Sequence, residues 1–465
     1  MKLKHLPSPL TRHFWPKLWR VVPPLAAVML VVWYNVSFLA WFHASRIIPT
    51  SELVLGLRSS AAKSDAYSRF QQLEKELRQS NIQFYMYELN EFLTPEVEAK
   101  VQDVVQLVYN QTCHFSNSYC ADLEAEQFIL RALARHKQRC VGDETVCPKD
   151  LIHILPLPSM ALFAVDCNTL PDLKKCGQRK YMKSHNEVFE ALKALQQHPR
   201  FQHGLRHVML SLRSRFFKGW EGRPYKKYLY NVTLANNFDP MACQDMLKDG
   251  AAGDYAEKYE DSEPMTKSNM VLGIGITGNI PFQLTTFYDW KAKQNYIFYR
   301  IRTTNFGFGA TPYRRAPLER VNWTDLPESC IGFDLPPDEW LGNITNSKYC
   351  IIMRGDTPHT HALLRAVRVG CIPVLISDQY QRYAGPFKSL IKIANFSVSI
   401  PEAEFMKNPQ ETLSGLQNLS DTVIKSTLEG MAFAQKLLFP DHPDSVFVEA
   451  FMKDAENSMK HFNAY

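Results

Sequence analysis

Residues 347–378 read SKYCIIMRGDTPHTHALLRAVRVGCIPVLISD, and this stretch decides the fold class. It opens and closes with short apolar runs, SKYCIIM and IPVLIS, whose isoleucine and valine content predicts buried strands. The residues between them have helical spacing, with Pro358 suited to the first helical position and Gly370 to the position that ends the helix. A strand, a crossover helix and a second strand form a βαβ unit, which predicts an α/β fold with parallel strands.

The turn RGDTP after the first of these strands contains the candidate ligand-binding residues. Asp356 or Thr357 is expected to cap the helix, whose exposed backbone N–H groups attract phosphate. Arg354 adds a cation that binds phosphate oxygens in a bidentate manner, and Asp356 or Asp378 is suited to accept hydrogen bonds from ribose hydroxyls. Because ligands of α/β folds bind at the carboxyl ends of the strands, the turn predicts a nucleotide-phosphate site. Helix capping alone would also explain these residues.

Two histidines in the same stretch do not favour a metal site. His359 and His361 are two residues apart, whereas a helix places metal ligands on one face at a spacing of four. The chain also contains no Asp-x-Asp pair, the arrangement on which many sugar-nucleotide enzymes hold a divalent ion. We therefore expect no metal and no bound cofactor.

The remainder of the chain alternates between strand and helix patterns. Strands are expected at 81–89, 150–158, 205–212, 270–278 and 296–304, and helices at 97–110, 123–137, 186–198, 420–439 and 445–462. This order predicts two doubly wound domains. We place an N-terminal α/β domain at 81–265, a C-terminal one at 266–440 and a final helix at 441–465.

The first eighty residues have a different character. Residues 1–20 hold basic side chains and no acid, and residues 21–42 contain no charged side chain. A helix of that length spans a bilayer, and the basic flank predicts a cytosolic tail with the remaining chain in the lumen. We expect an uncleaved signal anchor, although a cleaved signal peptide is the alternative. Residues 43–80 are expected to form a stem that includes the amphipathic stretch DAYSRFQQLEKELRQS.

Cysteines, sequons and charge agree with a secretory route. The ten cysteines all lie between Cys113 and Cys371, which suits an oxidising compartment. Three local pairs are close enough in sequence to form disulfides, namely Cys113 with Cys120, Cys140 with Cys147 and Cys167 with Cys176. Outside the expected span, glycosylation sequons occur at Asn110, Asn231, Asn322, Asn343, Asn395 and Asn418. The net charge of +6 comes almost entirely from the tail, so we expect no nucleic-acid partner.

The opening stretch resembles the signature segment of the exostosin-type glycosyltransferases of family GT47. That segment reads as a strand, then G-D-T-P, a helix, and G-C-I-P-V-I-x-S-D, and the positions from Gly355 to Pro358, from Gly370 to Val374, and Ser377 and Asp378 match it. Weaker similarity extends over residues 80–400. Arg354 and Arg365 depart from the residues that many members have, which leaves the donor sugar open.

The resemblance implies a GT-B-like enzyme with two Rossmann-like domains, behind a single N-terminal transmembrane helix and stem. It implies a type II Golgi membrane protein that inverts configuration without a metal. The donor is then a nucleotide sugar, expected to be UDP-linked and held by the C-terminal domain, and the acceptor is a glycan or glycoprotein on the N-terminal domain. A homo- or hetero-oligomer is also compatible with it.

The site residues follow from these expectations. Nucleotide binding is assigned to Arg300, Arg302, Arg354, Gly355, Asp356, Thr357 and Asp378. Candidates for the catalytic base are His207, at the start of one strand pattern, and Asp150, just before another. Two alternatives remain: a membrane-anchored adhesion or lectin-like protein that displays Arg-Gly-Asp, and an inactive partner subunit of a transferase complex.

Overall fold

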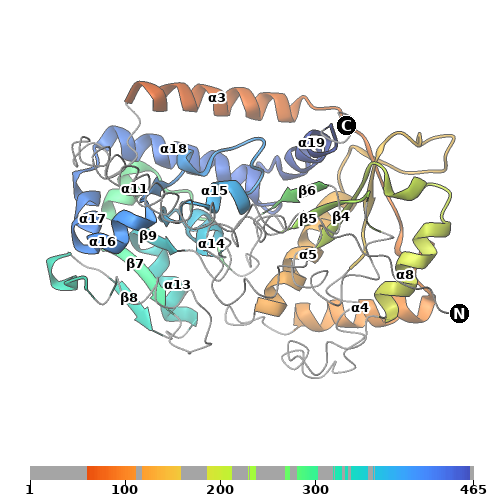
Figure 1. Cartoon of the computed structure of the whole chain (residues 1–465), viewed down its shortest axis with the longest axis horizontal. Coiled ribbons are helices and arrows are strands. Elements are labelled where there is room, and N and C mark those ends of the chain that lie inside the picture. Colours follow the sequence, from red (N-terminus) through yellow and green to blue (C-terminus); the bar gives the residue numbers. More distant parts are fainter. Residues whose placement is uncertain are drawn as a thin grey trace, which may run out of the picture. The chain divides into compact units, whose positions relative to one another are not determined.

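A computed structural model describes most of the chain beyond residue 59. The described residues are 60–110, 118–158, 186–211, 229, 231–236, 268–272, 280–301, 318, 320–326, 330–333, 337–353, 360 and 362–460. The chain divides into two compact units, residues 1–57 and 58–465, of which the first lies outside the described residues. The second unit is an α/β structure with two parallel sheets, as expected (Figure 1).

The first sheet has six strands in the order β2-β1-β3-β4-β5-β6. Its strands are β1 (Phe84–Met86), β2 (Arg139–Cys140), β3 (Ile152–Leu155), β4 (His207–Ser211), β5 (Thr233–Asn236) and β6 (Ser268–Val271). All neighbouring strands run parallel. Helices α4 (Pro95–Asn110), α5 (Ser118–Ala134) and α8 (Asn186–Gln197) lie between these strands in the sequence, close to the predicted positions.

The second sheet has five parallel strands in the order β11-β10-β9-β7-β8. Its strands are β7 (Asn295–Ile301), β8 (Cys330–Phe333), β9 (Ser347–Met353), β10 (Ile372–Ile376) and β11 (Val398–Ser399). Helices α11 (Phe287–Ala292), α13 (Pro337–Thr345) and α14 (Ala362–Arg368) connect or precede them. The predicted strand pair around α14 is confirmed, and every residue of β10 is buried.

Both sheets share one strand order. If the strands of each sheet are numbered by their sequence, the order is 2-1-3-4-5 in both, with β6 added at the edge of the first. In this order the chain leaves the first strand in one direction and later returns in the other, which creates a topological switch point between the first and third strands. The switch points lie between β1 and β3 and between β7 and β9.

Three expectations need correction. The strand expected at 270–278 was assigned to the C-terminal domain, but β6 pairs with β5 and forms the edge of the first sheet. The helix expected from Pro358 begins at Ala362, and the described Thr360 before it is not helical. Strands β2, β5, β8 and β11 were not predicted, because none has more than four residues and periodicity is weak over so short a run.

The stem expected at 43–80 needs correction for residues 60–78, which form a helix. Helix α3 (Ser60–Arg78) lies along α18 (Asp421–Leu438) and also contacts α19 (Phe447–Lys460), as Figure 1 shows for α18. The Phe70 ring stacks on Phe433 at a centroid distance of 5.1 Å. Lys436 Nζ lies 3.0 Å from a Glu74 carboxylate oxygen. The helix is therefore part of the folded unit, because its apolar face is covered by the C-terminal helices.

The membrane anchor is a separate matter. Within the described residues, no helix is both long and apolar enough to cross a bilayer. The expected span at 21–42 and the tail at 1–20 lie outside the described part of the chain.

Candidate functional site

The carboxyl ends of three neighbouring strands form the candidate site. Ile376 of β10 is paired with Met353 of β9, so these two strands end level. The register of β7 against β9, in which Phe298 pairs with Cys350, brings Ile301 to the same level. The switch point between β7 and β9 therefore opens at this edge, where α/β folds bind their ligands.

The predicted nucleotide-binding residues belong to this edge by sequence. Arg300 is the penultimate residue of β7, and its side chain lies outside the description. Arg302 follows β7 directly, and residues 354–357 follow β9 directly; all of them lie outside the described residues. Asp378 comes two residues after β10. In sequence, all seven predicted residues lie at the end of one of these strands or within four residues after it, and Asp378 is the one whose side chain is described.

Asp378 links β10 to the helix α16 (Glu402–Lys407). One carboxylate oxygen of Asp378 accepts a hydrogen bond from the Glu402 backbone N–H at 3.1 Å. In return the Asp378 N–H donates to the Glu402 carboxylate at 3.2 Å. This reciprocal pair satisfies one free N–H at the start of α16. Asp378 is exposed and uses only one carboxylate oxygen here, so the expected role toward ribose stays a prediction.

Tyr380 ties the segment after β10 to the segment before α14. Its ring is fully buried, and its hydroxyl donates to the Thr360 carbonyl at 3.3 Å. Burial raises the pKa of this phenol above its usual value, so the hydroxyl stays protonated and available as a donor. The Thr360 hydroxyl in turn accepts from the Ala362 N–H at 3.3 Å. These contacts fix the entry to α14, close in sequence to the predicted phosphate-binding turn.

The other end of α14 is held by two side chains that the sequence did not single out. Lys293 is buried, and its ammonium donates to the Val369 and Gly370 carbonyls at 3.2 and 2.9 Å. Burial lowers the pKa of Lys293 to about 8. The Gln435 amide donates to the Val367 carbonyl at 2.7 Å. A cation and an amide donor here satisfy carbonyls that a helix C-terminus leaves free.

Arg368, on the last turn of α14, anchors the helix to the C-terminal segment. Its guanidinium donates to both carboxylate oxygens of Asp441, with one distance of 2.9 Å, and also to the Ile280 carbonyl. Its central carbon lies 3.7 Å from the Phe282 ring centroid. Arg365, the position that departs from the family pattern, lies over Trp340 at 5.4 Å. In the described structure these two arginines therefore make protein contacts.

The two candidate bases lie at the opposite edge of the other sheet. His207 is the first residue of β4, and Asp150 precedes β3. Since the strands are parallel, both residues mark the amino edge of the first sheet, away from the edge where α/β folds bind ligands. Asp150 is exposed. Its placement gives a catalytic role no support.

His207 is a fully buried residue whose ring nitrogens are both engaged. Its Nδ1 lies 2.6 Å from the Leu205 carbonyl, and its Nε2 lies 2.8 Å from the Tyr87 hydroxyl. Nδ1 therefore carries the proton and Nε2 accepts. Burial lowers the pKa of His207 to about 3, with a smaller contribution from the neighbouring His153. These contacts describe a neutral structural histidine, and its assignment as a base finds no support in them.

His153 completes this buried layer. Its ring stacks on His207 at a centroid distance of 4.6 Å. Neither ring nitrogen has a partner at hydrogen-bond geometry among the described residues, and the Leu151 backbone favours the protonated ring less than burial and Arg200 disfavour it. Burial and then the nearby Arg200 lower its pKa to about 4. The aromatic sequence signal in residues 84–87 and 153 thus marks a core layer of the first sheet.

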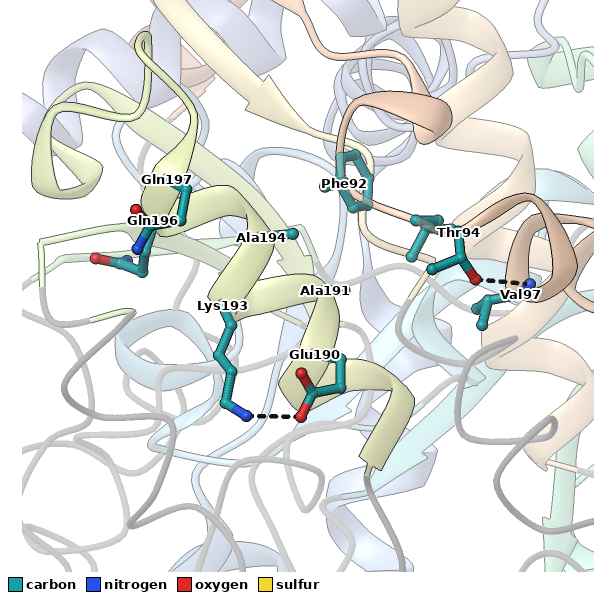
Figure 2. A pocket seen from close by; sticks show the side chains of 10 residues that line it. Phe92, Thr94, Val97, Glu190, Ala191, Lys193, Ala194, Gln196 and Gln197 are labelled. Carbon is teal, nitrogen blue, oxygen red and sulfur yellow. Dashed lines mark hydrogen bonds and ion pairs between the residues drawn. The ribbon is translucent and has the colours of Figure 1, made fainter.

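A pocket of about 520 Å³ lies on the helices of the first sheet. Figure 2 shows Phe92, Thr94 and Val97 on one side and α8 on the other, with Lys193 paired to Glu190 at 2.7 Å. Its lining also includes Ala191 and the polar side chains of Gln196 and Gln197. This pocket belongs to different elements from those of the predicted nucleotide site.

Cysteine pairing is confirmed in one case and was missed in another. Cys140 and Cys147 form the expected disulfide, and Cys350 of β9 is bonded to Cys371 at the entry to β10. The pairs 113–120 and 167–176 lie outside the described residues or side chains. Among the side chains that are described, no group of His, Cys, Asp or Glu has the arrangement of a metal site.

Comparison with known proteins finds a family match for part of the chain. Residues 310–416 match the model of the exostosin GT47 domain, a segment that includes β8, β9, α14, β10 and the Asp378–Glu402 contact. No curated protein matches the chain. Two solved structures are similar at low identity. The GtfA/B complex has 11% identity and a TM-score of 0.31, with 58% of this chain and 60% of that chain covered.

The second is Arabidopsis thaliana UGT89C1 complexed with quercetin, with 8% identity and a TM-score of 0.28 over 72% of this chain and 76% of that chain. The chain thus spans about 60% of the length of the GtfA/B structure it matches. The family match includes β9 and β10, two of the three strands whose carboxyl ends form the candidate site. The match over residues 310–416 shows that this segment of the chain is similar to the exostosin GT47 domain.

Proposed function

We propose that this protein transfers a sugar from a UDP-linked donor to a glycan or glycoprotein acceptor with inversion. In this proposal the two parallel sheets are the two halves of a GT-B enzyme. The second sheet binds the nucleotide sugar, and the first sheet faces the acceptor. The observation that carries the proposal is that the GT47 match includes β9 and β10, whose carboxyl ends are level with each other and with the end of the neighbouring β7.

Charge compensation is the central requirement of the proposed reaction. The departing diphosphate gains negative charge in the transition state, and preorganised cations and N–H donors stabilise it. Arg302 and Arg354 follow directly in sequence after the adjacent strands β7 and β9, which end level, and we propose that both contact the diphosphate. The backbone of residues 355–357 supplies N–H donors next to them. Because the chain has no Asp-x-Asp pair, we propose that these groups act without a metal.

Nucleotide binding gives the first test. UDP is expected to raise the melting temperature of the protein, because a ligand that binds only the folded state stabilises it. Arg354→Ala or Asp356→Ala should remove most of the shift. Lys149→Ala is the matched control, since this exposed lysine precedes β3 at the amino edge of the first sheet and should leave the shift unchanged. No shift with any nucleotide would contradict the proposal.

Turnover separates the proposal from its alternatives. A panel of nucleotide sugars is offered with and without glycan extracts, and release of the free nucleotide is measured. An active enzyme releases nucleotide faster when its acceptor is present. An inactive partner subunit binds UDP without release, and an adhesion protein displaying Arg-Gly-Asp binds cells in a manner abolished by Asp356→Glu.

We further propose that the protein resides in the Golgi membrane as a single-pass type II protein with its catalytic unit in the lumen. The uncharged run at 21–42 behind a basic tail supports this orientation. The disulfide pairs agree with an oxidising compartment. Protease protection of the folded unit in intact Golgi vesicles, lost on adding detergent, is the expected result. A homo- or hetero-oligomer is tested by light scattering of the purified protein.

A further inference from the structure

The sequons of this chain differ in what the fold does to their side chains. Asn395 is followed by Phe396 and Ser397, which are 0% and 3% exposed, and the Ser397 hydroxyl donates to the Ile393 carbonyl at 2.9 Å. In the sequon of Asn231, the side-chain amide donates to the His203 carbonyl at 3.2 Å, and Thr233 is buried. A large hydrophilic glycan is poorly accommodated where the sequon is part of the core.

The sequon at Asn322 has the opposite character. Asn322 and Thr324 are both exposed, on the surface turn that holds the 3-10 helix η7 (Trp323–Asp325). The Asn322 side-chain carbonyl accepts hydrogen bonds from the Thr324 hydroxyl at 2.7 Å and from the Thr324 N–H at 3.4 Å. Its amide nitrogen Nδ2 has no hydrogen-bond partner among the described residues. The carbonyl is thus held by its own sequon threonine while the amide nitrogen is left for solvent.

The backbone around Asn322 is held by hydrogen bonds that do not involve the Asn322 side chain. The Asn322 N–H donates to the Gln410 side-chain carbonyl at 2.7 Å, and Arg320 donates to the Met406 carbonyl. Val321 and Leu326 on either side are buried. A substituent on Nδ2 would therefore extend from an anchored turn without displacing any described contact. Asn418 is also exposed, but the Ser420 hydroxyl of its sequon caps α18 by accepting from the Val423 N–H.

We propose that Asn322 is a site of N-linked glycosylation. In the transfer, Nδ2 attacks C1 of the terminal sugar of a polyprenyl diphosphate-linked oligosaccharide on the oligosaccharyltransferase of the secretory pathway. The bond from Nδ2 to C1 forms, the bond from C1 to the diphosphate oxygen breaks, polyprenyl diphosphate leaves, and Nδ2 loses one proton to solvent. The proposal rests on the lumenal orientation proposed above, and it does not depend on the donor sugar or on turnover.

The test uses the full chain expressed in a eukaryotic secretory host. Glycopeptides are mapped by mass spectrometry after enzymatic deglycosylation in heavy-oxygen water, which marks each formerly glycosylated asparagine. We expect Asn322 to be occupied. Asn322→Gln and Thr324→Ala should each remove one glycan from the intact mass, and Thr324→Ser should retain it. Ser397→Ala serves as the control and should remove none.

The possible outcomes are separable. An unmodified Asn322 in a protein that carries glycans at other sequons overturns the proposal and leaves the lumenal orientation intact. A chain without any glycan overturns both, while the UDP melting shift still tests the proposed activity. The melting curves of Thr324→Ala and Thr324→Ser are compared after both proteins have been deglycosylated. Matching curves would show that Thr324→Ala loses the glycan without misfolding, so that glycan occupancy at Asn322 tests the proposal directly.

Discussion

Asp454 on α19 is a carboxylate that the fold keeps away from water. Only 2% of its surface is exposed, and it accepts a hydrogen bond from the Ser389 hydroxyl. Burial raises the pKa of Asp454 from 3.8 to about 6, while the Ser389 hydrogen bond and the nearby Lys388 oppose the rise. Between these values the folded state keeps a proton that the unfolded state has lost. The contribution of Asp454 to stability therefore falls as the pH rises from about 4 to about 6.

Replacing this carboxylate by an amide should remove that pH dependence. Asp454→Asn retains an acceptor for Ser389 but cannot ionise, so at pH 7 the variant should be more stable by up to about 3 kcal/mol. Urea unfolding of the two proteins at pH 4.5 and pH 7.5 measures the difference. Stability curves of the two proteins that run parallel between these values would contradict the raised pKa.

Two glycines of the second sheet region make a matched pair. Gly370 ends α14 at a φ of +66°, and a Cβ there would overlap the Thr285 side chain. Gly370→Ala should cost about 2–4 kcal/mol, from the left-handed backbone and the overlap together. Gly342 lies within α13, and a Cβ added there would meet no other described side chain within 4 Å. Gly342→Ala should therefore stabilise by about 0.5–1 kcal/mol. Chemical denaturation measures both, and equal effects would contradict the argument.

At the scale of elements, α3 shows where sequence patterns were informative and where they were not. The amphipathic pattern predicted a helix, and a helix forms at Ser60–Arg78. The same pattern does not say what covers the apolar face, because its partners on α18 lie several hundred residues later in the sequence. The pairing of β6 with β5 was missed for the same reason: local spacing gives strand type but not strand neighbours.

The contact of α3 with α18 is expected to stabilise the folded protein. Phe70→Ala removes the stacking on Phe433 and should cost about 3–5 kcal/mol of stability. Lys75→Ala on the exposed side of α3 is the control and should change stability by less than about 0.5 kcal/mol.

A chain that begins after residue 80 should be far less stable than one that begins at residue 58, as thermal unfolding would measure. If the truncated chain is as stable as the longer one, α3 is a stem after all.

The disulfide between Cys350 and Cys371 encloses the predicted phosphate-binding turn and α14. Its cysteines are 21 residues apart in sequence, against a separation of 7 for Cys140 and Cys147. In the chain-entropy account, its removal should cost about 3 kcal/mol and removal of the shorter one about 2 kcal/mol. Double Cys→Ala variants of each pair, compared by thermal unfolding, test the order. A larger loss for the 140–147 pair would contradict it.

For the whole molecule, the sequence predicted which strands are neighbours at the candidate site better than it predicted the side-chain contacts around them. The motif at 354–378 indicated which strand ends matter, and the register of β9 and β10 confirms that these ends meet. The sequence did not identify a catalytic base that the structure supports. A histidine at the start of a strand, such as His207, looks the same in sequence whether its ring is free or is buried with both nitrogens hydrogen-bonded. Lys293 and Gln435 are not part of any sequence motif. Each donates hydrogen bonds to carbonyls at the C-terminal end of α14, which is distant from both in sequence.

The contacts of the C-terminal helix predict that the two sheets unfold cooperatively. Helix α19 contacts β5 and β6 of the first sheet as well as α18 and α3, and His136 after α5 lies 3.2 Å from Glu449 on it. Phe451 on α19 is fully buried. Phe451→Ala should therefore increase hydrogen exchange in peptides of both sheets, by an equal free energy of about 3–5 kcal/mol. Lys460→Ala, which loses only an exposed ion pair, is the control. Faster exchange confined to one sheet would show that the two sheets unfold independently of each other.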